Sequence, residues 1–262
     1  MNHHPLKGPS GLSIAREALV GIDLLGLPRA LFDASRTQTV AGQKKANVMV
    51  LPGFGANDAS TAPLRYFLSK QGFQTEGWGL GVNTGGRGLA KELSELSDRW
   101  DIDRDRPNVG EVEVPALCDQ MTDRVLARSK EIGAPVALVG WSLGGYVARE
   151  VARDLPDHVS TVVTLGSPVS GGPKYTSVAP LFRARGLDMD WIEEEIERRK
   201  ERPITQPVTV IYSKRDGVVG WQAALDHTSP RAMHHEVNCS HMGLGLNAKV
   251  WNIVLRALDE HA

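Results

Sequence analysis

Short apolar runs alternate with helical patterns along most of this chain, from about residue 47 to the C-terminal end. The clearest runs are NVMVL at 47–51 and VALVG at 136–140. Continuous apolar runs of this length are typical of strands that are buried on both faces of a parallel sheet. Four further strands are predicted at 73–78, 159–166, 207–213 and 232–237. The pattern therefore predicts an α/β fold, with a mostly parallel sheet of about six strands and helices on both faces.

Apolar residues recur every four positions in two segments of the C-terminal half. One stripe runs from Leu143 to Leu155 and the other from Leu246 to Leu258, and each gives a helix one apolar face to lay on the sheet. A further helix is predicted at 114–131.

The segment before that helix, 97–113, is rich in charge and is broken by Pro107 and Gly110. Charge and helix-breaking residues are typical of a surface insertion. We therefore expect a solvated loop there and no binding site.

The length of 262 residues suits a single α/β domain that spans 1–262. Residues 1–44 are expected to form an N-terminal helical extension, in which the apolar stretch from Ala18 to Leu27 is a packing helix. This stretch is far shorter than the roughly 20 apolar residues that a membrane span needs.

Residues 169–206 interrupt the alternation of strands and helices and are predicted to form a lid-like insertion. Asp190 and Glu193 have the spacing of a capping box at the start of a short helix. That helix has a small apolar face formed by Trp191, Ile192 and Ile196, and its predicted outer pairs are Glu194 with Arg198 and Glu195 with Arg199. A helix that merely packs on the surface is the alternative interpretation.

Composition excludes several classes of function. The 30 basic and 31 acidic side chains nearly cancel, so no field of one sign is available to hold nucleic acid or an anionic membrane by charge alone. The two cysteines, Cys118 and Cys239, cannot build a disulfide framework, although one bridge between them remains open. The N-terminus shows no secretory signal pattern, and we expect a cytoplasmic protein.

The segment VALVGWSLGGYVARE carries the strongest signal for chemistry. Gly140, Ser142 and Gly144 fit the pattern G-x-S-x-G between a predicted strand and a predicted helix. A serine in such a sharp turn needs the glycines, because a side chain at either position would collide with neighbouring backbone. The start of the following helix favours negative charge near the hydroxyl. Ser142 is therefore the candidate nucleophile, and a structural turn serine is the alternative.

A serine hydroxyl is a weak nucleophile and needs a histidine base that a carboxylate holds in the correct tautomer. His241 lies in a loop between the last predicted strand and the last helix, where the side chain can reach the end of the sheet. His234 and His235 lie inside the strand itself, where side chains alternate between the two faces. His241 is therefore the candidate base.

The candidate acid is Asp216, which directly follows the predicted strand at 207–213 and gives the chain order Ser, Asp, His. The segment between Asp216 and His241 is long enough for one helix and one strand, so both side chains can return to the same end of the sheet. Asp226 is the alternative acid, and Asp216 itself also suits a simple turn before a glycine.

Acyl transfer also needs hydrogen-bond donors for the oxyanion. The candidates are the backbone N–H groups of Leu143, which follows the nucleophile, and of Phe54, in the loop VLPGFGAND. Gly53 and Gly55 allow the backbone of this loop to approach a substrate closely. An ordinary glycine-rich turn is the alternative.

Together the segments LPGFGAND, GWSLGGYVARE, TLGSPVSGGP, YSKRDGVVGW and CSHMGLGLN resemble the α/β-hydrolase family, and its bacterial lipase- and esterase-like members in particular. The resemblance covers roughly residues 45–262 and implies a covalent acyl-enzyme on Ser142 that water resolves, with no metal and no organic cofactor. Val169 replaces a histidine that is frequent in the family, so no role is carried over to that position. Leu51-Pro52-Gly53 likewise departs from the common form, which has a histidine before the glycine.

Apolar residues near the candidate site indicate a pocket for a small, apolar ester: Trp141, Trp78, Val169 and Trp191, with the ring of Phe54. Thioester and amide substrates remain open, as does an acyltransferase that uses the same triad. A noncatalytic ligand-binding protein on the same scaffold is the alternative from another class.

Overall fold

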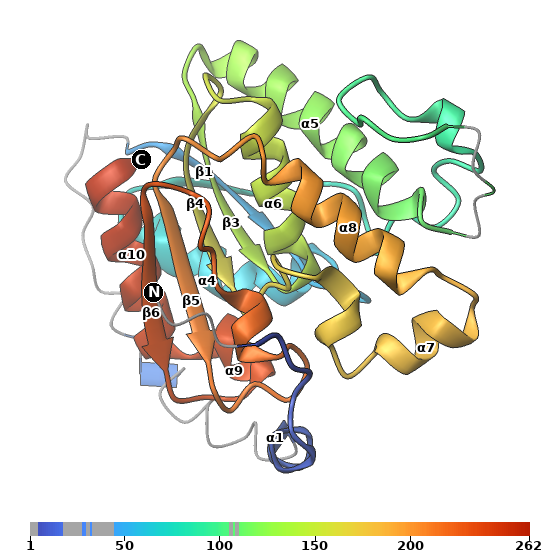
Figure 1. Cartoon of the computed structure of the whole chain (residues 1–262). Coiled ribbons are helices and arrows are strands. Elements are labelled where there is room, and N and C mark those ends of the chain that lie inside the picture. The colour runs from blue at the N-terminus through green and yellow to red at the C-terminus, as the bar shows by residue number, and fades with distance from the viewer. Residues whose placement is uncertain (1–4, 18–27, 30–31, 33–44, 105–106, 108–109) are drawn as a thin grey trace.

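The computed structural model describes residues 5–17, 28–29, 32, 45–104, 107 and 110–262 (Figure 1). The packing helix predicted at 18–27 lies outside these residues. In the N-terminal extension the structure shows α1 (Gly11–Arg16), whose first turn is capped by the Ser10 side chain. In the described part of the chain, no helix is long and apolar enough to cross a membrane.

Six parallel strands form one sheet in the order β2-β1-β3-β4-β5-β6. The strands are β1 (Asn47–Leu51), β2 (Gln74–Gly77), β3 (Val136–Trp141), β4 (Val159–Leu165), β5 (Val208–Ser213) and β6 (Ala232–Val237). All six predicted strands and the α/β fold class are confirmed. The chain changes direction across the sheet between β1 and β3, and in open parallel sheets ligands bind beyond the carboxyl ends of the strands at such a point.

Helices cover both faces of the sheet because successive strand residues point to opposite sides (Figure 1). Met49 and Leu51 of β1 pack on one side, where α5 and α6 lie, whereas Val48 and Val50 pack on the other. The covering helices are α4 (Asp58–Lys70), α5 (Glu113–Ile132), α6 (Leu143–Asp154), α9 (His241–Leu246) and α10 (Ala248–His261), with single 3₁₀ turns at η2 (Leu93–Glu95) and η4 (Trp221–Ala224). The later residues of the two predicted stripes, from Val147 on α6 and from Val250 on α10, are thus core positions. Leu246 does not belong to the last helix as predicted, because it ends α9.

Residues 169–206 form η3 (Gly172–Tyr175), α7 (Ala179–Ala184) and α8 (Met189–Arg199). The cap of α8 differs from the prediction: Asp188, rather than Asp190, accepts hydrogen bonds from the first backbone N–H groups of the helix. Capping follows the backbone conformation of the residue before the helix, and Asp188 has the extended conformation that this position needs.

The predicted outer pairs on α8 are also wrong. Arg198 pairs with Glu195, one residue closer than expected. Arg199 turns inward, where it pairs with Glu150 and, at 2.9 Å, with Asp154 of α6. A buried cation needs buried anions, and α6 supplies them, so Arg199 anchors α8 to the helix that follows the candidate nucleophile.

Cys118 and Cys239 are both buried and no disulfide joins them, so the bridge that the sequence left open is not formed. Burial raises the pKa of the Cys118 thiol well above its ordinary value, with a further rise from the nearby Glu150 carboxylate.

The buried carboxylate of Glu150 lies between Arg153, at 3.2 Å, and Arg199. Burial alone raises the pKa of this carboxyl, but the two guanidinium groups outweigh burial and hold its pKa at about 2. We expect Glu150→Ala to lower the free energy of unfolding by about 3–5 kcal/mol, because it leaves buried guanidinium groups short of a partner. Denaturant unfolding measures this change, with Glu194→Ala, on the exposed side of α8, as the control.

The same ion pairs make the stability of the folded protein depend on pH. Because the folded-state pKa of Glu150 lies below its ordinary value of 4.5, the contribution of this carboxylate to stability is complete above pH 4.5 and is lost as the pH falls toward 2. A difference between wild type and Glu150→Ala that stays constant across this range contradicts the assignment.

Candidate active site

Ser142 occupies a strained turn between β3 and α6. Its backbone angles are φ 54° and ψ −124°, and within the described ranges it is the one residue other than glycine with a positive φ. Its N–H donates a hydrogen bond of 2.8 Å to the carbonyl oxygen of Leu165, at the end of β4. Such a conformation costs about 1–3 kcal/mol and persists only where the surrounding structure enforces it.

Two glycines make this turn sterically possible. A Cβ atom at Gly140 would collide with the backbone of Gly145 and Gly144, and one at Gly144 would lie 2.5 Å from the carbonyl oxygen of Leu51. The steric reason predicted for both glycines is therefore confirmed. Their absence of side chains lets α6 begin directly against the ends of β1 and β3.

The structure brings His241 and Asp216 together. His241 Nδ1 lies 2.7 Å from Asp216 Oδ2, and both side chains are buried. The other carboxylate oxygen, Oδ1, accepts hydrogen bonds from the backbone N–H groups of Val218 and Val219. The carboxylate is thus fixed by its own turn and holds the imidazole with Nε2 left as the acceptor.

The alternative acid and bases point elsewhere. Asp226 forms a buried ion pair of 3.1 Å with Arg149, and its loop is closed by backbone N–H groups on the same carboxylate. His234 accepts a hydrogen bond from the backbone N–H of Asp226, at 3.1 Å. Neither residue contacts His241 in the part of the chain that the structure describes.

Trp141 braces the backbone of His241. The indole N–H of Trp141 donates to the His241 carbonyl oxygen at 3.2 Å, and the two rings lie 6.1 Å apart. Ser142 and His241 line the same cavity, but among the described residues no hydrogen bond joins the hydroxyl to the imidazole. Catalytic hydrogen bonds of this kind are often long before substrate binds.

The predicted oxyanion donors lie on the same cavity. Phe54 and Leu143 both line it, and in the described structure neither backbone N–H donates a hydrogen bond to the protein. The loop that carries Phe54 is held by Asn83. The side-chain amide of Asn83 donates to the Pro52 carbonyl oxygen at 2.9 Å, and its backbone carbonyl oxygen accepts a hydrogen bond from the Gly55 N–H. Asn83 is fully buried, and the sequence analysis gave no signal for it.

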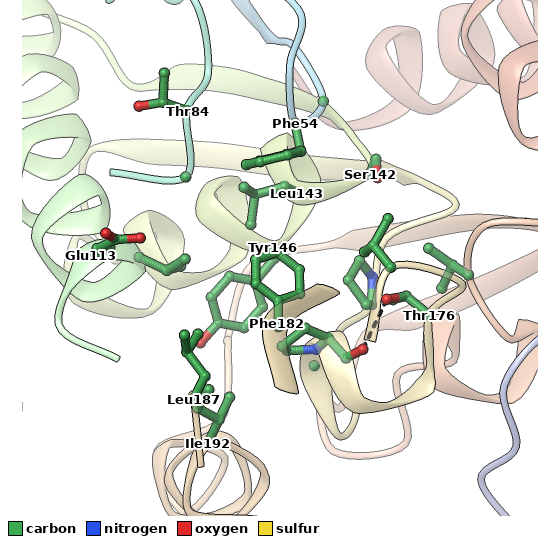
Figure 2. A pocket seen from close by; sticks show the side chains of 18 of the residues that line it. Phe54, Thr84, Glu113, Ser142, Leu143, Tyr146, Thr176, Phe182, Leu187 and Ile192 are labelled. Atoms are coloured by element: carbon green, nitrogen blue, oxygen red, sulfur yellow. Dashed lines mark hydrogen bonds between the residues drawn. The ribbon is translucent and has the colours of Figure 1, made fainter. Parts of the chain in front are cut away.

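The cavity has a volume of about 490 Å³, which is within the range of small-ligand sites. Figure 2 shows that Ser142, Phe54 and Leu143 lie on one side of it, whereas the insertion supplies the facing side. The labelled residues of that facing side are Thr176, Phe182, Leu187 and Ile192. The wall is mostly apolar, so the cavity favours a hydrocarbon group.

Two of the four predicted pocket residues line the cavity, namely Trp141 and Trp191. Trp78 and Val169 do not, and this part of the prediction is corrected. Trp78 is 1% exposed in the core, with its indole N–H on the Gly81 carbonyl oxygen. Val169 is also buried and does not line the cavity, whereas its neighbour Pro168 does.

The described part of the segment 97–113 is not only a solvated loop, as its charge predicts, because it also supplies cavity wall. Trp100, Ile102 and Glu113 line the cavity, and Trp100 is almost completely buried. Arg185, in the insertion, pairs with Glu113 at 3.1 Å and closes the cavity wall between the two segments. Trp100 and Ile102, two apolar residues two positions apart in a charged segment, were the available signal.

Comparison with known proteins supports the fold. The family model described as PGAP1-like alpha/beta domain matches residues 117–254, which is more than half of the chain. No curated protein matches the sequence.

Several solved structures are similar to this one. A monoacylglycerol lipase from Paleococcus ferrophilus has 15% identity and a TM-score of 0.55, over 84% of this chain and 97% of that chain. A soluble variant of monoglyceride lipase from Saccharomyces cerevisiae has 14% identity and a TM-score of 0.54, over 83% and 87%. The thioesterase domain from the curacin biosynthetic pathway has 13% identity and a TM-score of 0.50, over 82% and 90%. The predicted α/β-hydrolase resemblance is confirmed at the level of the fold.

We expect Gly140→Ala to lower the free energy of unfolding by about 1–3 kcal/mol or more, because the new methyl group meets backbone that cannot move aside. Thermal unfolding measures the loss. Gly8→Ala is the control, since nothing lies within 4 Å of a Cβ atom there. Equal stability of the two variants contradicts the packing described for this turn.

Proposed function

The chain belongs to the PGAP1-like alpha/beta domain family, and on that premise we propose that it is a serine hydrolase that cleaves carboxylic esters. The observation that carries the proposal is the strained turn of Ser142, which opens onto the same apolar cavity as the His241–Asp216 pair. Strained backbone of this kind is typical of functional sites, and a buried histidine–carboxylate pair beside a serine is the arrangement that activates a hydroxyl.

The proposed reaction has two halves. Ser142 Oγ attacks the ester carbonyl carbon while its proton passes to Nε2 of His241, and the negative charge on the carbonyl oxygen is held by the N–H groups of Phe54 and Leu143. The C–O bond to the alcohol then breaks, and His241 returns the proton to the leaving oxygen. Water attacks the acyl-enzyme by the same route and releases the acid and free Ser142.

Asp216 orients His241 and stabilises its imidazolium form without taking the proton. The N–H groups of Val218 and Val219 hold this carboxylate in place, since they donate to the oxygen that His241 does not use.

The substrate is proposed to be a small molecule with an apolar acyl group. The walls from α7 and α8 present Phe182, Ile192 and Trp191 to the cavity, which suits a hydrocarbon chain and not a sugar or peptide. A thioester, or an acyl acceptor other than water, uses the same residues and is the second candidate. The similarity to a thioesterase domain supports that candidate only through the shared fold.

We further propose that the chain is one domain, with 1–44 as an extension and 169–206 as a lid-like insertion. The insertion supplies one wall of the cavity, which supports this division. Two cysteines that no disulfide joins suit a reducing compartment, and a cytoplasmic location remains our prediction.

The proposal is tested with a fluorophosphonate probe followed by peptide mapping. We expect covalent labelling at Ser142, and we expect Ser142→Ala to abolish labelling and lower kcat for p-nitrophenyl esters by about 10⁴-fold to 10⁶-fold. Ser60→Ala is the matched control, because Ser60 lines the same cavity but its hydroxyl donates to the Asn57 carbonyl oxygen. Labelling of folded wild-type protein at a site other than Ser142 overturns the proposal.

Chain length in the p-nitrophenyl series tests the acyl cavity. We expect kcat/KM to rise about fourfold for each added methylene until the cavity is filled. Ile192→Trp fills part of the cavity, so kcat/KM for the longest good substrate is expected to fall at least about tenfold while short esters change little. Glu194→Trp, on the exposed side of the same helix, is the control. An equal loss for short and long esters argues against an acyl group in this cavity.

A further inference from the structure

The N-terminal segment 5–17 lies across the two loops that carry Asp216 and His241. Its last residue, Glu17, accepts hydrogen bonds on one oxygen, Oε1, from the backbone N–H of Gly217 at 2.8 Å and from that of His241 at 2.7 Å. The other oxygen is 3.4 Å from the backbone nitrogen of Met242. One carboxylate thus connects the residue after the candidate acid with the candidate base itself.

The rest of the segment fits closely against the same loops. A Cβ atom at Gly217 would collide with the carbonyl oxygen of Ser13, and one at Gly220 would collide with that of Lys7. Leu6 packs on a small apolar cluster of Val219, Ala223 and Ala224. Contacts along the whole segment therefore place Glu17 where its carboxylate can reach both loops.

On the side of the strands, a further side-chain contact joins the segments that lead to Asp216 and His241. Ser213, at the end of β5, donates its hydroxyl hydrogen to the Cys239 carbonyl oxygen at 2.6 Å. Beyond that point the loops are connected by the His241–Asp216 hydrogen bond and by Glu17. Without Glu17, the backbone N–H groups of Gly217 and His241 would lose the common acceptor that joins them.

We propose that Glu17 is a positioning residue, which fixes the backbone of Asp216 and His241 so that Nδ1 and Oδ2 stay in hydrogen-bond contact while Nε2 faces Ser142. This inference rests on the proposed serine hydrolase function. Glu17 does not touch the reacting atoms. Its effect is geometric, because displacement of a catalytic group by about 1 Å is enough to cost roughly a hundredfold in rate.

Three substitutions separate geometry from charge. Glu17→Gln keeps an Oε1 acceptor at the same reach without the charge, whereas Glu17→Asp keeps the charge but is one methylene too short to reach both N–H groups. Glu17→Ala removes both. Leu12→Ala is the matched control in α1, since this side chain is 62% exposed.

The first readout is steady-state hydrolysis of the best p-nitrophenyl ester. We expect Glu17→Ala and Glu17→Asp to lower kcat by about tenfold to a hundredfold with little change in KM, and Glu17→Gln to stay within about threefold of wild type. The control is expected to match wild type. If the aspartate variant is as active as wild type, or the glutamine variant is as impaired as the alanine variant, the positioning role is overturned.

The second readout does not depend on activity. The proton between His241 Nδ1 and Asp216 is buried and gives a separate downfield NMR signal when the hydrogen bond is held. We expect this signal in wild type and Glu17→Gln, and its loss or broadening in Glu17→Asp and Glu17→Ala. An unchanged signal in all variants overturns the inference even if the protein is an active esterase. Failure of wild type to react at Ser142, with the signal sensitive to Glu17, overturns the proposed function and leaves the positioning of the pair established.

Discussion

The positive φ of Ser142 is the constraint on which the site depends. A conformation that costs about 1–3 kcal/mol is held because β1, β3 and β4 meet α6 around it. Leu165 of β4 accepts its N–H, and Gly144 packs against the end of β1. The register of the sheet thereby sets the direction of the Ser142 hydroxyl. A shift in the register of one strand would move this candidate nucleophile.

Around this fixed point, the cavity is assembled from segments that are far apart in the sequence. The loop after β1 brings Phe54, the insertion brings Phe182 and Trp191, and the segment before α5 brings Trp100. Each contributes apolar surface to one space at the carboxyl edge of the sheet. The apolar character of that space is thus a property of the tertiary structure, and the Ser142 hydroxyl opens onto surface that no single segment supplies.

The sequence predicted the sheet because strands buried on both faces must be continuously apolar, as in 136–140. It predicted Ser142 and Asp216 as candidates because each follows a predicted strand, and His241 because it lies between the last predicted strand and the last predicted helix. The short helix α9, which begins at His241, was not predicted. The predictions from the sequence were wrong where a charged side chain pairs with a residue that is far away in the sequence. Arg199 has the pattern of a surface residue, but its partners on α6 lie far away in the sequence. The same limit applied to 97–113, whose charges concealed two apolar wall residues.

The anchoring of α8 has a consequence for how this kind of site can diversify. Arg199 joins α8 to Glu150 and Asp154, and these residues belong to the helix that starts at the nucleophile. The wall that α8 forms is thus held rigidly against α6, and substitutions at Arg199 are expected to affect both this wall and the turn of Ser142. In the described structure, residues 178–187 form no buried ion pair with α6. Their Arg185 pairs with Glu113, at the start of α5, instead. Substitutions that change the shape of the cavity are therefore expected to accumulate in that stretch, with Ser142 and its turn left as they are.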